Sequence, residues 1–314
     1  MMIMRILYFT LFLVFIYSCE TEFDPDIPDT APEIVVEGII EAGDRPSPPY
    51  VILTRSIPFF TTVSQDALDD IFIHGATITV KEGTNEVSLT EICLEDLSAE
   101  QQAQAANLFG VDLSQLGVNF CVYVDLSFSM LGASEKSYDL RIEVEGKVLT
   151  ATTTIPPQVG LDNLFFTEPP GEPNDSLMEL NATISDPAGT PNFYRFFTQV
   201  NDEPLYPGFP SVGDDLLFDG QSLTFPIPKA ASRETDFADI DIETFGLFVR
   251  GDSVLVKQAT IDEAHFRFWN TLEFNATNQG PFSTYTLIET NINGGLGLWG
   301  GYNANYYELV VPEE

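Results

Sequence analysis

The segment 137–155, SYDLRIEVEGKVLTATTTI, is the part of the sequence that most restricts how the chain can fold. Apolar and charged residues alternate from Tyr138 to Glu145, Gly146-Lys147 interrupt the alternation, and a second run rich in threonine follows. Successive side chains of a β-strand point to opposite faces, whereas a helix needs an apolar period of about 3.6 residues. The pattern therefore predicts a β-hairpin with one buried face.

Similar short runs recur along the chain and predict further strands. In the first half they are EIVVEGII at 33–40, YVILTRS at 50–56, ATITVKEG at 76–83 and FCVYVDLSF at 120–128. Pro156-Pro157 closes this set, and turns at 186–189 and 251–252 predict two more hairpins in the second half. The predicted fold class is mainly β, with two antiparallel, Ig-like β-sandwich modules at residues 34–158 and 159–314.

Two segments carry helix signals instead. Residues 261–275 hold Ile261, His265, Phe268 or Trp269, and Leu272 at helical spacing, which predicts one helix in the second module. Within residues 93–121, Ser98 precedes Gln101 by three positions in a capping-box pattern, and good helix formers follow up to Gly110. This predicts a helical insertion in the first module.

The first eighteen residues predict a signal peptide. One cation, Arg5, precedes an apolar run from Ile6 to Tyr17, which is shorter than the roughly 20 residues that a membrane-spanning helix needs. Ser18 directly before Cys19, with Ile16 upstream, resembles the lipobox of bacterial lipoproteins. That resemblance implies that Cys19 is acylated and anchors the chain on a membrane. An ordinary secretory signal with an incidental cysteine is the alternative.

Residues 19–33 are acidic and proline-rich, and they predict a solvated tether between the anchor and the folded body. The acidic residues directly after Cys19 also resemble the surface-export signal of Bacteroidota lipoproteins, which implies the outer membrane and its cell-surface face. Thr30, between Asp29 and Ala31, matches a short O-glycosylation tripeptide of the same bacteria and is a candidate modification site.

The charge of the chain excludes one class of function. The formal net charge is -35 and becomes -36 without residues 1–18, because these carry Arg5 and no acidic residue. So few lysines and arginines cannot form the cationic patch that binds nucleic acid phosphates. We therefore expect no nucleic-acid partner.

Cys93 and Cys121 are the cysteines left after Cys19. An even pair in an exported chain favours a disulfide, here at the base of the helical insertion. Two buried free thiols are the alternative.

The segment NINGGLGLWGGY, from Asn291 to Tyr302, raises the question of a phosphate site. A phosphate-binding loop needs Gly-Lys-Ser/Thr and a following helix, but Leu298-Trp299 and an aromatic run follow here. Glycine also permits positive φ and close backbone approach. We therefore interpret Asn291, Gly294, Gly295 and Gly297 as a structural motif.

No candidate catalytic residue and no metal site emerge from the sequence. The two histidines, His74 and His265, are isolated, and no Gly-x-Ser-x-Gly elbow occurs. His265 falls on the apolar stripe of the predicted helix, where a core histidine is the usual explanation. The acidic segment Asp214–Gly220 lacks the ligand spacing of a calcium loop and is interpreted as a solvated turn. We expect a non-catalytic protein without a cofactor.

Taken in order, IVVEGII, VILTRS, ATITV, the 138–153 hairpin, PNFYRFF, DDLLFDG, GDSVLV and NINGGLGLWGGY resemble the Bacteroidota lipoprotein family of domain of unknown function 4249 (DUF4249). The resemblance implies an outer-membrane lipoprotein, commonly encoded beside TonB-dependent receptors. We therefore expect an acylated surface protein that assists such a transporter in binding or taking up a nutrient of unknown identity. A stand-alone glycan-binding or adhesion module is the alternative, favoured if Trp269, Trp299 or the tyrosines 302, 306 and 307 form an exposed platform.

Overall fold

The computed structural model describes residues 31–57, 71–109, 119–171, 175–231, 244–278 and 286–313. Residues 32–314 form one compact unit, which is mainly β, as predicted. The strands of its first part are β1 (Ile34–Gly43), β2 (Ser47–Arg55), β3 (Thr77–Glu82), β4 (Asn85–Cys93), β5 (Cys121–Val124), β6 (Ser137–Val144) and β7 (Lys147–Thr154). Those of its second part are β8 (Leu161–Thr167), β9 (Leu177–Ser185), β10 (Phe193–Val200), β11 (Tyr206–Asp214), β12 (Ser222–Pro226), β13 (Phe248–Val249), β14 (Ser253–Ile261) and β15 (Leu296–Val310).

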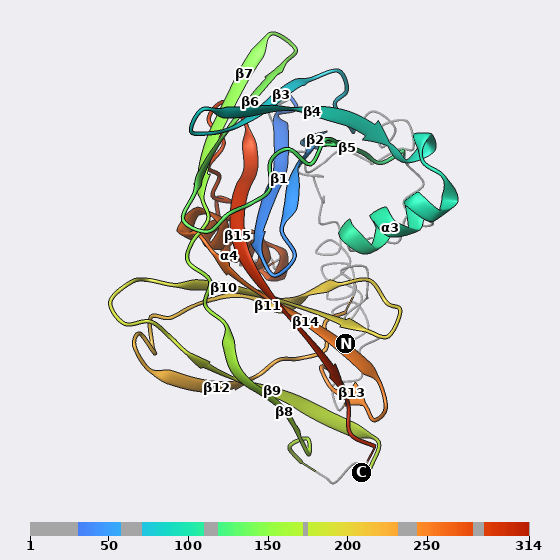
Figure 1. The fold of residues 1–314 in the computed structure, drawn as a ribbon, viewed down its shortest axis with the longest axis vertical. Helices are drawn as coiled ribbons and strands as arrows, with labels where there is room; N and C mark the ends of the chain where they lie inside the picture. The colour runs from blue at the N-terminus through green and yellow to red at the C-terminus, as the bar shows by residue number, and fades with distance from the viewer. Residues whose placement is uncertain are drawn as a thin grey trace, which may run out of the picture. The chain divides into compact units, whose positions relative to one another are not determined.

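Most strands belong to one eleven-stranded sheet, in the order β11-β10-β14-β15-β1-β2-β5-β4-β3-β6-β7. The sheet curls, so that β7 comes back against the segment leading into β15, where Thr150 and Asn293 exchange backbone hydrogen bonds of 3.2 and 2.8 Å. The curl encloses a first core of mainly aliphatic side chains together with Tyr123, Tyr138 and Trp299. Figure 1 shows β1 to β7, which belong to this curled part of the sheet, in its upper half.

The 137–155 hairpin is confirmed. β6 and β7 pair from Ser137↔Thr154 to Val144↔Lys147, and the side chains of β6 are alternately exposed and buried along its whole length. The buried set is the predicted one: Tyr138, Leu140, Ile142 and Val144.

The second part of the chain builds a sandwich. Strands β8, β9, β12 and β13 form a small sheet in which β9 is central, and it faces the β10, β11, β14 and β15 end of the large sheet. A second core lies between the two layers and includes Leu180, Tyr194, Phe248 and Val256. The β-sandwich-like prediction for the fold is thereby met.

The two hairpins predicted in the second half are wrong, although both turns exist. β9 pairs with β8, β12 and β13, whereas β10 pairs with β11 and β14, so the turn at 186–189 connects two different sheets. The turn at 251–252 also connects the two sheets, because β13 pairs with β9 whereas β14 pairs with β10 and β15. The buried faces of β9 and β13 in the small sheet meet those of β10 and β14 in the large sheet across the second core. The chain therefore buries these faces by crossing from one sheet to the other, and not by forming a hairpin within one sheet.

Strand β15 joins the two parts of the sheet. Its first nine residues pair with β1 in parallel, the one exception to the antiparallel pairings between named strands, and residues from Tyr302 onward pair with β14. Figure 1 shows β15 passing from beside β1 to beside β14. The predicted domain boundary near residue 158 stays a prediction, and the sheet runs across it.

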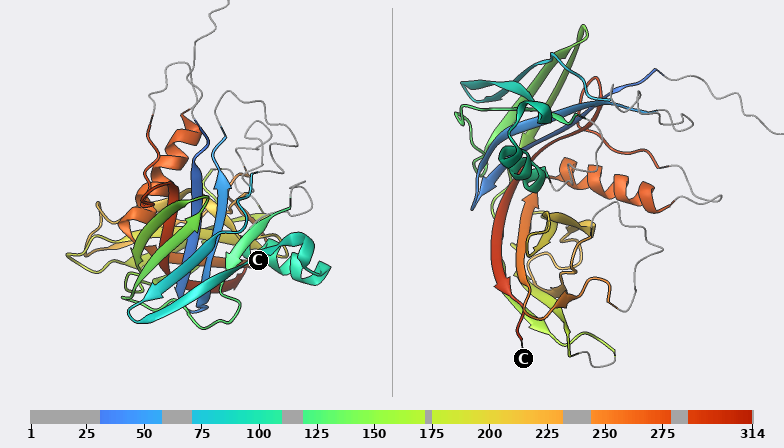
Figure 2. Two further views of the ribbon diagram at one scale, coloured as in Figure 1. Left: turned by 90° about the horizontal axis from the view of Figure 1, so that it is seen from above. Right: turned by 90° about the vertical axis from the view of Figure 1, so that its right-hand side faces the viewer.

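Two α-helices are described. α4 (Glu263–Thr277) begins two residues later than predicted because Ile261 ends β14, and the Asp262 side chain caps the helix by accepting from the His265 N–H at 2.8 Å. It packs on the large sheet against β10, β11 and β15 (Figure 2). α3 (Ala99–Phe109) lies in the insertion, where Ser98 and Gln101 form the predicted capping box at 2.9 and 3.4 Å. Gly110 lies outside the described residues.

Candidate functional site

The Asn291 motif forms the entry into β15. The side chain of Asn291 donates to the Trp299 carbonyl at 2.8 Å and accepts from the Trp299 N–H at 2.9 Å, so its amide acts as a neighbouring strand would. The Trp299 ring is fully buried, and its Nε1 donates to the Tyr138 carbonyl at 2.9 Å. The motif therefore fixes a core tryptophan at the start of the central strand.

The glycines of this motif lie where protein atoms fill the space beside them. Gly297 has φ +104, and a Cβ there would lie 1.9 Å from the Val36 carbonyl oxygen of the paired strand. A Cβ on Gly295 would lie 2.5 Å from the Leu149 side chain, and Gly294 has φ +90. These positions have the geometry of close strand packing, in which side chains do not fit.

A charged network is buried where β1, β14 and β15 meet. The Lys257 ammonium donates to Glu41 at 2.7 Å and to the Tyr302 hydroxyl at 2.8 Å. Tyr302 and Tyr306 in turn donate to the two carboxylate oxygens of Glu41, at 2.8 and 2.5 Å. Burial lowers the pKa of Lys257, and Glu41 opposes that effect. The network provides hydrogen-bond partners for an ion pair in the core, and among its four residues only Tyr306 is partly exposed.

His265 lies beside this network, on the buried face of α4. It is fully buried, and its Nε2 lies 3.5 Å from Nη1 of Arg195, whose guanidinium covers the Trp269 ring at 3.7 Å. Burial first, and the positive charges of Arg195 and Lys257 next, hold the pKa of His265 well below its ordinary value. His265 is therefore a neutral core histidine, as its position on the apolar stripe predicted, although its Nδ1 has no hydrogen-bond partner among the described residues.

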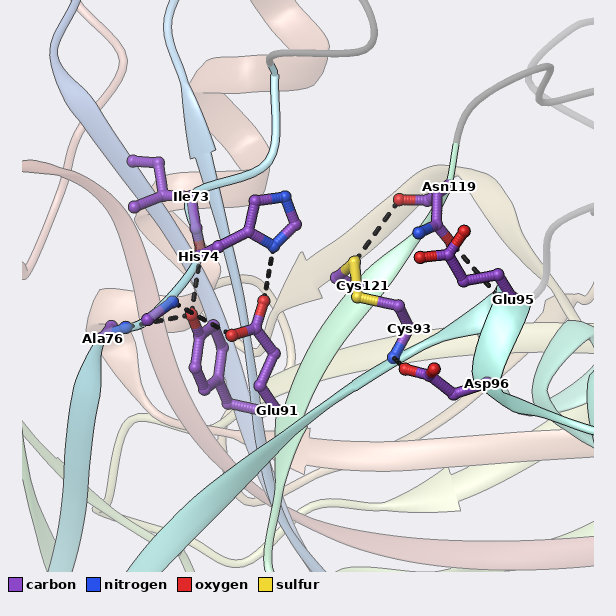
Figure 3. The surroundings of a disulfide bond; sticks show 11 residues. Ile73, His74, Ala76, Glu91, Cys93, Glu95, Asp96, Asn119 and Cys121 are labelled. Carbon is purple, nitrogen blue, oxygen red and sulfur yellow. Dashed lines mark hydrogen bonds and ion pairs between the residues drawn. A yellow bond between two sulfur atoms is a disulfide. The ribbon is translucent and has the colours of Figure 1, made fainter.

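The other histidine lies in an accessible cluster next to the disulfide (Figure 3). Cys93 and Cys121 are bonded, as predicted, and face each other directly across the β4–β5 pair. Two positions before Cys93 on the same face of β4, the Glu91 carboxylate contacts His74 Nδ1 at 2.5 Å. One side-chain donor atom from each of these four residues lies within 4.8 Å of the other three. We call these four residues the His74 cluster.

The backbone around His74 is held by two neighbours on the β4–β5 pair. The Tyr123 hydroxyl donates to the Ile73 carbonyl at 2.9 Å and accepts from the Ala76 N–H at 3.1 Å. Glu91 accepts from the Gly75 N–H at 3.0 Å. Burial raises the pKa of Glu91, but the hydrogen bonds from Gly75 and His74 outweigh it, and the net shift is downward. Glu91 is therefore an anion beside the imidazole.

Sequence reasoning predicted the disulfide but missed the rest of the His74 cluster. The signal available was weak, because it consisted of the i, i+2 spacing of Glu91 and Cys93, which places both on one face of a strand. Nothing in the sequence brings His74 to that face, since its neighbourhood is set by Tyr123, nearly fifty residues away.

Another unpredicted feature is a group of three carboxylates at 186, 215 and 219. Asp186 and Asp215 are buried, so the segment Asp214–Gly220 is not the fully solvated turn that its composition indicated. Asp186 accepts from the Tyr194 hydroxyl, and Asp215 accepts from the Asn192 N–H at 2.8 Å. Burial and the nearby charges of Asp186 and Asp219 raise the pKa of Asp215. These acids anchor the connection between the two sheets.

An apolar groove lies between the β10–β11 edge and β12. Phe196, Phe209, Pro210 and Phe225 are among its walls, and its volume is about 220 Å³. Phe209 is 44% exposed at this edge. An aromatic groove of this kind suits an apolar or flat-faced group of a ligand or of a partner's side chain.

Four predicted features lie wholly or partly outside the described residues: the signal peptide, the acylation site Cys19, the candidate glycosylation site Thr30 and the tether, of which residues 19–30 are not described. Within the described ranges, no helix has the length and apolarity needed to cross a membrane.

The fold and these clusters define a mainly β protein built around a long, glycine-rich central strand. Residues 20–308 match the family of the domain of unknown function DUF4249. The match covers most of the chain, so the chain belongs to this family, as its sequence motifs indicated. No curated protein matches it.

Proposed function

We propose that this protein is an acylated, surface-exposed lipoprotein of the outer membrane. The observation that carries the proposal is the apolar run 6–17 followed by Ser18-Cys19 and then by an acidic, proline-rich segment. Several acyl chains at about 0.8 kcal/mol per buried methylene hold a protein on a membrane firmly. The strong negative charge keeps the tethered body soluble. It also disfavours contact of the body with anionic lipid, so that the acyl anchor alone would hold the protein on the membrane.

We further propose that the folded body is non-catalytic and assists a TonB-dependent transporter in binding or taking up a nutrient. The resemblance to lipoproteins encoded beside such receptors motivates this role. Two features of the fold fit it: His265 is buried and neutral, and the apolar groove beside Phe209 offers a binding surface at a sheet edge. The anchor would restrict the search for the transporter to the plane of the membrane.

The alternative, a stand-alone glycan-binding module, depended on an exposed aromatic platform. Trp299 is fully buried, Trp269 is 5% exposed and Tyr302 is 8% exposed, so these rings are not available for stacking on a sugar. Among the candidates named for that platform, burial leaves only Tyr306 and Tyr307 partly accessible. The transporter-associated role is therefore the one we favour.

The anchor can be tested by replacing Cys19 with alanine. We expect the wild-type chain to incorporate a labelled fatty acid and to sediment with membranes, and Cys19→Ala to do neither. The double variant Cys93→Ala/Cys121→Ala is the matched control, because it removes two cysteines and is expected to keep the label. Mass spectrometry of the mature N-terminus completes the measurement. A mature chain that begins elsewhere and carries no lipid contradicts the proposal.

The partner can be tested by cross-linking on intact cells followed by purification from a detergent extract. We expect one TonB-dependent barrel protein to be enriched with the wild-type chain. Enrichment should fall for Phe209→Ser, which changes the exposed edge of the groove, and persist for Phe274→Ser, at an exposed site on α4. No enrichment of any barrel protein contradicts the transporter role, whatever the result for the anchor.

A further inference from the structure

We propose that the Cys93–Cys121 disulfide is the oxidised form of a metal site. When the disulfide is reduced, the two thiolates of the His74 cluster, together with an imidazole nitrogen of His74 and a carboxylate oxygen of Glu91, bind one thiophilic divalent cation such as Zn²⁺. The protein would then hold either the disulfide or the ion, and the redox state of its surroundings would decide which.

The donor set is of the kind that zinc takes. Zinc in proteins is bound by cysteine sulfur at about 2.3 Å, histidine nitrogen at about 2.0 Å and carboxylate oxygen at about 2.0–2.2 Å, and structural sites are tetrahedral. Two ligands at these distances in a tetrahedron lie roughly 3.3–3.8 Å apart. In the His74 cluster each of the four donor atoms already lies within 4.8 Å of the others. Small side-chain rotations therefore suffice to bring all four to one ion.

Three of the ligands come from one rigid surface. Cys93 and Cys121 are directly opposite on β4 and β5, and Glu91 lies two residues along β4 on the same face. Sites built on paired strands keep their geometry better than sites on loops. The fourth ligand, His74, is fixed by the hydrogen bonds that Tyr123 and Glu91 make to the backbone on either side of it. These bonds restrain the backbone that carries His74, as hydrogen bonds from outer-shell residues restrain the ligands in zinc sites.

Charge and access also suit a cation. One carboxylate and two thiolates would give the ligand set a formal negative charge of three, which the ion largely compensates. The His74 side chain is 56% exposed, so an ion can reach the cluster from solvent. Cys121 is only 2% exposed but Cys93 is partly exposed, so a reductant reaches the disulfide from the side of Cys93. Figure 3 shows the disulfide beside His74 and Glu91.

The chemistry balances with an external dithiol as reductant. One of its thiolates attacks a cysteine sulfur, the Cys93–Cys121 bond breaks, and a mixed disulfide forms. The second thiol of the reductant then displaces the remaining cysteine, so the reductant leaves as its own disulfide and both cysteines are reduced. Binding of Zn²⁺ to the two thiols releases their two protons. The disulfide form of the same dithiol is the oxidant of the reverse reaction: it exchanges back to two thiols, the Cys93–Cys121 bond forms again, and the ion is released because its two thiolate ligands are consumed.

The test uses the full chain in detergent with Cys19→Ser in every arm, so that Cys93 and Cys121 supply the only thiols. After reduction with a phosphine, which becomes the phosphine oxide, the protein is titrated with Co²⁺ without oxygen. We expect one equivalent to bind, with sulfur-to-cobalt charge-transfer bands and the visible bands of tetrahedral Co²⁺, and Zn²⁺ to displace it. The oxidised protein should show neither set of bands.

Variants separate this site from incidental binding to thiols. His74→Ala and Glu91→Gln should each weaken binding at least about tenfold, the loss seen even when groups that only orient metal ligands are changed. Glu86→Gln, an exposed position on the same strand, is the matched control and should leave the affinity unchanged. Equal affinity of the oxidised and reduced protein would overturn the proposal. So would thiolate bands that neither His74→Ala nor Glu91→Gln weakens, the result that an unfolded reduced chain would also give.

Discussion

Alanine in place of Gly297 is expected to destabilise the protein by at least about 4 kcal/mol, a loss larger than most single substitutions cause. The added Cβ would lie 1.9 Å from the Val36 carbonyl oxygen and 2.9 Å from the Val36 nitrogen. Both contacts are with backbone, which cannot rotate away, and the backbone at Gly297 has φ +104, where an L side chain is strained as well. The strand pair β1–β15 has to open locally to accept the methyl group.

The consequence reaches both parts of the fold, because β15 pairs with β1 at one end and with β14 at the other. Gly251→Ala is the matched control: its φ is +86, but a Cβ there meets nothing within 4 Å. It should cost only the left-handed backbone penalty, about 1–2 kcal/mol. Urea denaturation followed by tryptophan fluorescence measures both, since Trp299 lies two residues from Gly297. Equal losses for the two variants would mean that backbone conformation, and not close strand approach, explains the glycine.

Much of the local structure could be predicted because it depends on neighbours in the sequence. The alternation in 137–155 fixes which side chains of β6 are buried, and the capping box at Ser98 fixes where α3 begins. The apolar stripe containing His265 and Trp269 placed α4 to within two residues. In each case the signal and the structure span fewer than twenty residues.

Strand partners could not be predicted in the same way. Alternation tells which face of a strand is buried, but both a hairpin and a crossing between two layers bury that face. The segments around 186–189 and 251–252 carry good turn residues, and the turns form; the strands they connect nevertheless pair elsewhere. The parallel pairing of β1 with β15 could not be predicted either, since it joins residues about 260 positions apart.

The candidate site residues that could be predicted are likewise those for which the sequence itself carries a signal. Cys93 and Cys121 could be paired because they are the even pair of cysteines that remains after Cys19 in a chain predicted to be exported. His74 and Glu91 are as near to that bond in space, but no local pattern links them. Glu41 and Lys257 are further apart still, separated by 216 positions, and each would be taken in isolation for an exposed charge.

That pair leads to the second large effect: Glu41→Ala should destabilise the protein by about 3–5 kcal/mol, the usual result of removing one partner of a buried ion pair. The side chains of Lys257 and Glu41 are only 8% and 6% exposed. Without the carboxylate, the Lys257 ammonium keeps the Tyr302 hydroxyl as a neighbour but loses its countercharge, and Tyr302 and Tyr306 lose the acceptor for their protons. Thermal and chemical unfolding measure the loss.

Two further variants distinguish burial of charge from loss of contacts. Glu308→Ala breaks the exposed pair with Arg45, where the Glu308 side chain is 76% exposed, and should cost no more than about 1 kcal/mol. Glu41→Met/Lys257→Met removes both charges, and it should be more stable than Glu41→Ala, because replacing a whole buried pair by apolar side chains is often neutral. If Glu41→Ala costs no more than Glu308→Ala, water reaches the pair. If the double variant is the least stable, the hydrogen bonds of the tyrosines to Glu41, and not the unpaired ammonium, hold this junction of β1, β14 and β15 together.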